Sequence, residues 1–336
     1  MGRREAVNVV PRKNDLRLRH AELPREQFRN PNLKLEIDLS VIRRNVEHIA
    51  KSCGVLLLPV VKADAYGLGI EAVAETIADL AEGFCVFQAR EAIAADLAER
   101  TGKRVLVLGP PEFSNAEDYI AHGLTPTVCN PGEARQLRKA HPALCIDTGM
   151  QRFACPPDDC REAMIAGDCR EAFTHATQLG HVEQLNELTA HFDVKRHAAA
   201  TSLLDHPQAR LDAVRPGLAM YRNAVTISSP IVELHQSRGP AGYSGFTSAH
   251  HGVILVGYAH GLRKGPCLIN GRKSQILEVG MQSAFVEAEP GDSVGDDVVL
   301  LGQSLQPSDI APAWNCSPHE VLKSLTSAAT RHCRYS

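Results

Sequence analysis

The chain has 336 residues, of which 44% are apolar and 22% are charged, and its formal net charge is −3. This composition is typical of a globular protein, and the length favours two domains over one. The charge gives no electrostatic case for a nucleic-acid partner, and no apolar run reaches the ~18 residues of a membrane span.

The N-terminus and the cysteines indicate a compartment. Residues 1–30 are polar and rich in arginine, so we expect an N-terminal extension rather than an export signal. The ten cysteines are scattered, and none has the Cys-x-x-Cys spacing. We therefore expect a cytoplasmic protein with reduced, mostly buried thiols, no disulfide framework and no metal site.

Strand and helix patterns alternate through the first two thirds of the chain. An alternating pattern predicts a strand at 33–37. Caps at 38–40 and apolar residues at helical spacing from Val41 onward predict a helix that ends at Cys53-Gly54. The continuous apolar run 55–61 is typical of a strand buried on both faces. Further strands are predicted at 83–87, 104–108, 125–128 and 143–147. This alternation favours an α/β fold, a closed (β/α)₈ barrel at residues 31–222.

The pattern changes after residue 222. Helical periodicity weakens, and strand-like segments punctuated by glycine follow at 252–256, 275–279, 284–288 and 298–301. These segments predict a mostly β C-terminal domain at residues 223–336.

Lys62 is the first candidate functional residue. It ends the apolar run within the segment Pro-Val-Val-Lys-Ala-Asp-Ala-Tyr-Gly-Leu-Gly at 59–69. Side chains at the carboxyl ends of barrel strands face the active site, and desolvation there lowers the pKa of an amine and prepares it for Schiff-base chemistry. Taken alone, the pattern fits a surface lysine just past a strand equally well.

The segment around Lys62 resembles the cofactor-lysine motif of the alanine racemase family, whose members are fold-type III enzymes that use pyridoxal 5'-phosphate (PLP). Other segments resemble further motifs of the family in the same order: 147–152 (DTGMQR), Thr174-His175, 197–201, 214–221 (VRPGLAMY), 242–245 and 257–261 (GYAHG). Ordered motifs across the chain are more specific than any single one, and the chain is identified as a diverged member of that family.

The resemblance implies two catalytic bases. Lys62 would hold PLP as an aldimine and act as one base, and Tyr243 would be the other, because racemisation removes a proton from one face and returns it to the opposite face. His175 and Arg215 would assist the tyrosine, and Arg215 would also face the pyridine nitrogen of PLP. Without the resemblance, Tyr243 is only a loop aromatic between glycines.

The resemblance also implies binding residues. The cofactor phosphate would be held by the hydroxyl groups of Tyr66 and Thr201 and by the backbone N–H groups of Gly217 and Leu218. The amino-acid substrate would be bound by Arg152, which pairs with its carboxylate, and by Tyr258 and Met281. The family assembles its site from two chains, so a homodimer with shared active sites is expected.

Three departures from the family pattern concern the substrate. Cys145 stands where many members carry a carbamylated lysine, and His260 and Gln282 replace two aspartates. The leading hypothesis is a PLP-dependent amino-acid racemase. One alternative is a diverged enzyme that acts on another amino acid as an epimerase, lyase or decarboxylase. A second alternative is a non-catalytic PLP-binding protein, although such proteins lack the opposing tyrosine and the C-terminal β domain.

Overall fold

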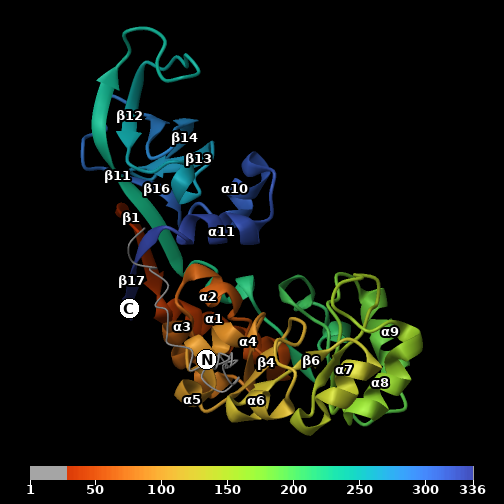
Figure 1. The fold of residues 1–336 in the computed structure, drawn as a ribbon. Coiled ribbons are helices and arrows are strands. Elements are labelled where there is room, and N and C mark those ends of the chain that lie inside the picture. Colours follow the sequence, from red (N-terminus) through yellow and green to blue (C-terminus); the bar gives the residue numbers. More distant parts are fainter. Residues whose placement is uncertain (1–28, 336) are drawn as a thin grey trace, which may run out of the picture.

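The computed structural model describes residues 29–335, so the predicted extension at 1–30 lies almost wholly outside the described residues. Figure 1 shows a lower body of helices and short strands and an upper body made mostly of strands. No helix among residues 29–335 is long and apolar enough to cross a membrane.

The lower body is a closed barrel of parallel strands. One sheet has the order β2-β10-β9-β8-β7-β6 and the other has the order β3-β4-β5. Its strands are β2 (Leu56–Leu57), β3 (Gly83–Val86), β4 (Arg104–Val107), β5 (Leu124–Thr125), β6 (Thr127–Val128), β7 (Ala143–Cys145), β8 (Glu171–Phe173), β9 (Lys195–His197) and β10 (Ala213–Val214). A parallel bridge between Val60 and Cys85 joins the two sheets on one side, and β5 and β6 are separated only by Pro126 on the other. The expected (β/α)₈ barrel is therefore confirmed.

Helices surround the barrel. They are α1 (Leu39–Cys53), α3 (Ile70–Ile77), α4 (Ala89–Ala94), α5 (Leu97–Thr101), α6 (Ala116–Ala121), α7 (Pro131–Gln136), α8 (Cys160–Gly167) and α9 (Leu179–Thr189). The longest, α1, begins where the Asp38 carboxylate accepts the N–H of Val41 at 3.1 Å and ends at Gly54, whose φ is 66°. These are the capping groups that helix ends require.

The barrel interior is filled by side chains. Leu58, Val60, Cys85, Leu106 and Phe173 form a buried cluster there with their neighbours, so the barrel is a packed core rather than a pore. Functional groups therefore lie at the barrel mouth, beyond the carboxyl ends of the strands.

The upper body is one eight-stranded sheet with the order β12-β15-β14-β13-β16-β11-β1-β17. Its strands are β1 (Asn30–Asp38), β11 (Val225–Gln236), β12 (His250–Ile254), β13 (Gly265–Ile269), β14 (Arg272–Val279), β15 (Ala284–Glu287), β16 (Asp297–Leu301) and β17 (Ala329–Arg334). The mostly β C-terminal part is confirmed. The strand predicted at 33–37 exists, but it pairs with β11 and β17 and not with the barrel. The division at 31–222 and 223–336 stays a prediction.

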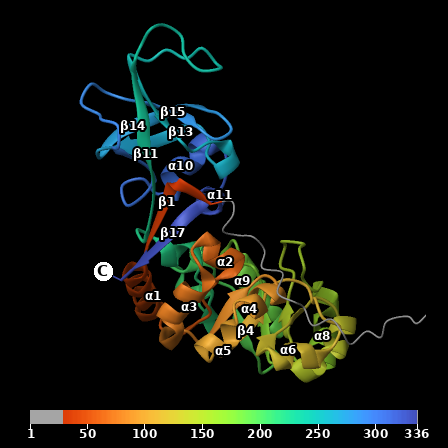
Figure 2. The same ribbon diagram turned by 60° about the vertical axis from the view of Figure 1, so that its left-hand side comes forward.

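Two helices of the upper body were not predicted. They are α10 (Pro307–Trp314) and α11 (Pro318–Thr326). In Figures 1 and 2, α11 lies between the sheet and the top of the barrel, close to the segment that follows Lys62. This position lets the second half of the chain contact the barrel mouth.

Candidate active site

Lys62 begins a left-handed turn, α2 (Lys62–Gly67), two residues after the bridge at Val60 that joins the two barrel sheets. The next residues, Ala63, Asp64, Ala65 and Tyr66, have φ values of 56°, 62°, 50° and 60°. For residues other than glycine this conformation costs ~1–2 kcal/mol each. A run of this kind persists only where surrounding contacts hold it, and such strain gathers at functional sites.

The contacts that hold the turn come from both halves of the chain. Within the barrel, Glu91 Oε1 accepts the N–H of Asp64 at 2.5 Å. From the C-terminal half, Arg331 on β17 pairs with the Asp64 carboxylate. Thr326, the last residue of α11, donates its hydroxyl hydrogen to the Tyr66 carbonyl at 2.8 Å. The upper body thus fixes the position of the lysine.

The Lys62 amine lies in an environment that disfavours its charged form. Burial lowers its pKa, and the positive charges of Arg152 and Arg215 lower it further. Lys62 lines a cavity of about 700 Å³ whose other lining residues include Phe87 and Gln88 from the barrel and Thr326 from α11. An amine with a lowered pKa and access to a cavity is a nucleophile for carbonyl groups.

Arg215 is buried beside the barrel core. Its guanidinium donates to the carbonyl oxygens of Thr174 at 2.5 Å, His197 at 2.9 Å and Ala198 at 3.3 Å. It also contacts Nδ1 of His197 and lies 4.9 Å from the centre of the Phe173 ring. These contacts leave the guanidinium little freedom to move.

A buried charge network continues from His197. Its Nε2 atom lies 2.8 Å from a carboxylate oxygen of Glu171, which also accepts two hydrogen bonds from Arg104 at 2.7 and 3.0 Å. Burial and the Arg215 charge lower the pKa of His197 to about 4, so its ring is neutral at pH 7. Although burial alone would raise it, the pKa of Glu171 is held well below its usual range by His197 and Arg104.

The sequence motifs pointed to His175 as the partner of Arg215, whereas the imidazole that contacts Arg215 is that of His197. His175 is exposed at the barrel mouth. Desolvation by the surrounding protein and the charges of Arg215 and Arg152 lower its pKa to about 4. His175 at the mouth and the buried His197 are therefore both neutral at pH 7, although several cations surround them.

His319 was not singled out from the sequence, because no motif surrounds it. It lies on α11, with its ring centre 5.9 Å from that of Tyr66. Partial burial and the Lys62 charge lower its pKa. His319 is thus a further imidazole near Lys62, contributed by the C-terminal half.

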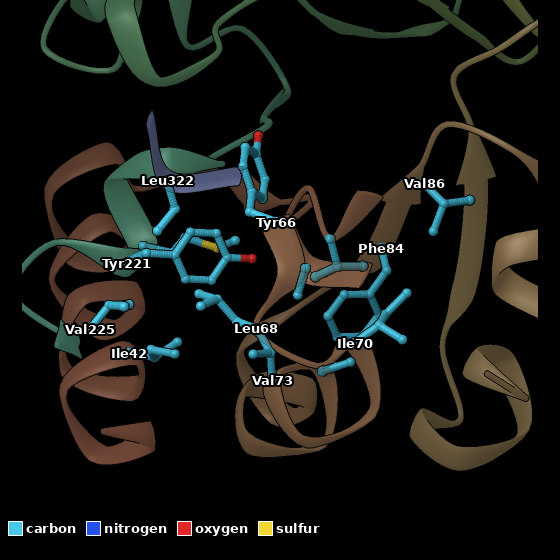
Figure 3. Packing of buried hydrophobic residues seen from close by; sticks show 14 of the residues in the cluster. Ile42, Tyr66, Leu68, Ile70, Val73, Phe84, Val86, Tyr221, Val225 and Leu322 are labelled. Carbon is cyan, nitrogen blue, oxygen red and sulfur yellow. The ribbon is translucent and has the colours of Figure 1, made fainter. Parts of the chain in front are cut away.

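Hydroxyl and amide groups gather beside Tyr66. The Thr201 hydroxyl oxygen accepts the N–H of Gly217 at 3.3 Å, and Leu218 opens a short 3₁₀ turn, η6 (Leu218–Tyr221), where the first N–H groups have no partner within the turn. A Cβ atom at Gly217 would lie 2.6 Å from the Tyr66 hydroxyl oxygen, so only glycine allows this close approach. Figure 3 shows Tyr66 beside Tyr221 with its hydroxyl directed away from the packed cluster.

A second group of predicted residues lies on the upper body. Tyr243, Tyr258 and Met281 are 93%, 57% and 61% exposed. The Tyr258 N–H donates to the Gly280 carbonyl at 2.9 Å, which joins the Tyr258 turn to the end of β14. The segment between β11 and β12, which carries Tyr243, lies at the end of the molecule away from the barrel in Figures 1 and 2.

The predicted site residues therefore form two groups. Lys62, Tyr66, Arg152, His175, Thr201, Arg215, Gly217 and Leu218 belong to the barrel and surround its mouth. Tyr243, Tyr258 and Met281 belong to an exposed face of the upper body.

The three departures from the family motifs have different surroundings. Cys145 is buried at the end of β7, and burial raises the pKa of its thiol to about 12, so it stays neutral. His260 accepts the N–H of Gly257 through Nδ1 at 3.1 Å and so stabilises its own turn. Gln282 is exposed beside Met281. Within residues 29–335, no three His, Cys, Asp or Glu side chains are grouped to hold a metal ion.

Comparison with known proteins places these features in one family. The alanine racemase N-terminal domain model matches residues 37–224, and the alanine racemase C-terminal domain model matches residues 225–333. Alanine racemase of Nitratidesulfovibrio vulgaris is 27% identical over 86% of this chain and 95% of its own length. Alanine racemase of Neisseria meningitidis serogroup C is 28% identical over 88% of this chain and 97% of its own length.

Solved structures show the same fold. The biosynthetic alanine racemase of Pseudomonas aeruginosa has a TM-score of 0.81 and 24% identity, with 90% of this chain and 99% of that chain covered. Alanine racemase of Bartonella henselae, described with covalently bound pyridoxal phosphate, has a TM-score of 0.79 and 21% identity. The match covers 91% of this chain and 100% of that chain. Because the two domain models together match almost all of the described residues, the chain belongs to the alanine racemase family.

Proposed function

We propose that this protein is a PLP-dependent racemase that interconverts L- and D-alanine, with Lys62 holding the cofactor. The observation that carries the proposal is the place of Lys62. Its amine has a pKa lowered by burial and by Arg152, and the residue lines a cavity of about 700 Å³ between the barrel and the C-terminal half. The names of the relatives support alanine as the substrate.

The groups at the mouth fit PLP. An amine with a lowered pKa suits an aldehyde, and the Tyr66 hydroxyl and the N–H of Leu218 suit a phosphate that must come close to Gly217. When bound, PLP withdraws electrons from the α-carbon of an attached amino acid and so weakens its bond to hydrogen.

Arg215 sets the electronic character of the site. Its guanidinium can only donate hydrogen bonds, so beside the ring nitrogen of a bound cofactor it would disfavour a proton on that nitrogen. The carbonyl oxygens of Thr174 and His197 hold it in place. An unprotonated ring is a weaker electron sink, which restrains side reactions such as transamination.

Racemisation also needs a proton donor and acceptor on each face of the α-carbon. Lys62 supplies one, because burial and the Arg152 charge lower the pKa of its amine and so favour the neutral form that accepts a proton. Tyr243 supplies the other. Arg152 orients the substrate by pairing with its carboxylate.

Tyr243 reaches the substrate only if a second chain contributes it. It is 93% exposed, and its segment lies away from the barrel of its own chain. A head-to-tail homodimer would place Tyr243, Tyr258 and Met281 over the partner's Lys62 and would cover their exposed surface. We also infer a cytoplasmic location, since all ten cysteines are free.

Incubation with PLP and L-alanine, followed by chiral chromatography, tests the proposed activity. The wild-type protein should form D-alanine until the two enantiomers are equal, and Lys62→Ala should form none. A protein that is fully loaded with PLP and forms no D-alanine would overturn the proposal and favour a diverged enzyme or a PLP-binding protein without this activity.

A further inference from the structure

The turn that carries Tyr243 is bound to a single carboxylate. Its ends meet where the Ala241 N–H donates to the Phe246 carbonyl at 2.9 Å. At its tip, Glu278 on β14 accepts the N–H of Tyr243 through Oε1 at 2.7 Å and the N–H of Ser244 through Oε2 at 2.6 Å. Each oxygen of the carboxylate thus binds one backbone N–H.

The local structure is built around this contact. Glu278 is only 5% exposed, and the hydrogen bonds from Ser244 and Tyr243 lower its pKa, so it stays ionised. Gly242 has a φ of 68°, and a Cβ atom there would lie 2.5 Å from Glu278 Oε1. Only glycine lets the turn come this close to the carboxylate.

Gly280, just after β14, leaves room beside the Tyr243 ring, because a Cβ atom added there would lie 3.8 Å from Cε2 of Tyr243. On the other side of the turn, the Phe246 ring packs against His251 and Phe285, at centre distances of 5.4 and 5.2 Å. The Glu278 carboxylate therefore binds the backbone of the turn, and the Phe246 ring packs at the side of the turn.

We propose that Glu278 is a positioning residue that fixes the backbone of Tyr243 so that the phenol of this exposed side chain meets the partner's substrate in one orientation. The inference rests on the proposed function, in which Tyr243 is a base. Glu278 does not touch the substrate. Its effect arises because reaction rates are sensitive to small displacements of a reacting group.

Glu278→Gln tests the proposal with little change of shape. An amide offers one oxygen and one NH₂ group, so one of the two backbone N–H groups would face a donor. We expect kcat to fall ~10- to 100-fold while KM for alanine changes little, because the turn is displaced and substrate binding at Arg152 is not. Glu278→Asp keeps both acceptor oxygens and should recover part of the lost kcat. Glu287→Gln, an exposed change on neighbouring β15, is the matched control and should match the wild type.

Amide hydrogen exchange gives a readout that does not depend on turnover. The peptide with Tyr243 and Ser244 should exchange faster in Glu278→Gln than in the wild type, with PLP loading and dimer content unchanged. Wild-type kcat in Glu278→Gln, or unchanged exchange at this peptide, would overturn the inference.

The Tyr243→Phe and Glu278→Gln variants together distinguish a failure of the proposed function from a failure of the positioning role. If Tyr243→Phe keeps full turnover, Tyr243 is not a base. The positioning role of Glu278 is then wrong as well, even if hydrogen exchange shows that Glu278 binds the turn. If Tyr243→Phe is inactive and Glu278→Gln is fully active, the proposed function stands and the positioning role is wrong.

Discussion

The guanidinium of Arg215 donates a hydrogen bond to Nδ1 of His197, and this contact fixes the protonation of a fully buried ring. Because a guanidinium has no acceptor, Nδ1 must accept, and the single hydrogen of the neutral ring is on Nε2, which donates it to Glu171. Protonation of His197 would break the contact with Arg215 and bring two positive charges together inside the barrel.

This arrangement predicts a protein that loses stability in mild acid. The pKa of His197 is lowered from 6.5 to about 4 in the folded chain, so between these pH values the unfolded chain binds the proton more readily. The stability is complete above pH 6.5 and falls as the pH drops towards 4. Urea unfolding should give a free energy lower at pH 5 than at pH 7.5 by on the order of 2 kcal/mol. His175, whose pKa is shifted in the same direction, adds to this difference.

His197→Gln removes one titrating group from the same position. The difference in unfolding free energy between pH 7.5 and pH 5 should become smaller than in the wild type, although the variant is less stable at both. An unchanged pH difference would show that His197 is not the source of the acid sensitivity.

Glu171→Gln should destabilise the fold directly. Arg104 and His197 both depend on this carboxylate, and loss of one member of a buried ion pair costs ~3–5 kcal/mol. Denaturant unfolding measures the loss. Glu183→Gln, on the exposed side of α9, is the matched control and should change stability by less than ~0.5 kcal/mol.

Gly217→Ala should weaken PLP binding through a steric effect on Tyr66. The added methyl group would lie 2.6 Å from the Tyr66 hydroxyl oxygen and would displace it. PLP titration followed by absorbance should show a higher dissociation constant, by ~10-fold for each 1.4 kcal/mol lost. In a Tyr66→Phe background the same change should cost less, because the clashing oxygen is absent; equal costs in both backgrounds would contradict this explanation.

Thr326→Val tests whether the C-terminal half stabilises the Lys62 turn. The variant keeps the shape of the side chain and removes its hydrogen bond to the Tyr66 carbonyl, worth ~1 kcal/mol. We expect weaker PLP binding as well as lower stability, since the strained turn carries both Lys62 and Tyr66. Ser304→Ala, an exposed change shortly before α10, should leave PLP binding unchanged.

Much of this fold is accessible from the sequence, because buried parallel strands and amphipathic helices have distinct patterns. The strands that a given strand pairs with cannot be predicted from its own sequence. The alternation at 33–37 predicts a half-buried strand correctly, yet nothing local shows that β1 pairs with β11 and β17, which follow about two hundred and three hundred residues later. Pairing over such distances is decided by tertiary packing.

The site shows the same limit. Motifs locate Lys62, Arg215 and the Tyr243 turn, because each combines a functional side chain with the glycines or prolines that shape its backbone. They do not show that His197 contacts Arg215, or that Glu278 binds the N–H groups of Tyr243 and Ser244. Those contacts join separate strands, and a lone glutamate on a strand has no signature before the fold is known.

Mixed dimers test the central proposal, a racemase site built from Lys62 of one chain and Tyr243 of another. Lys62→Ala and Tyr243→Phe chains are each expected to be inactive alone. After they are unfolded together and refolded, each mixed dimer should contain one intact site and form D-alanine from L-alanine at about half the wild-type rate per dimer. If the mixture forms PLP-loaded dimers but no D-alanine, the shared site is contradicted.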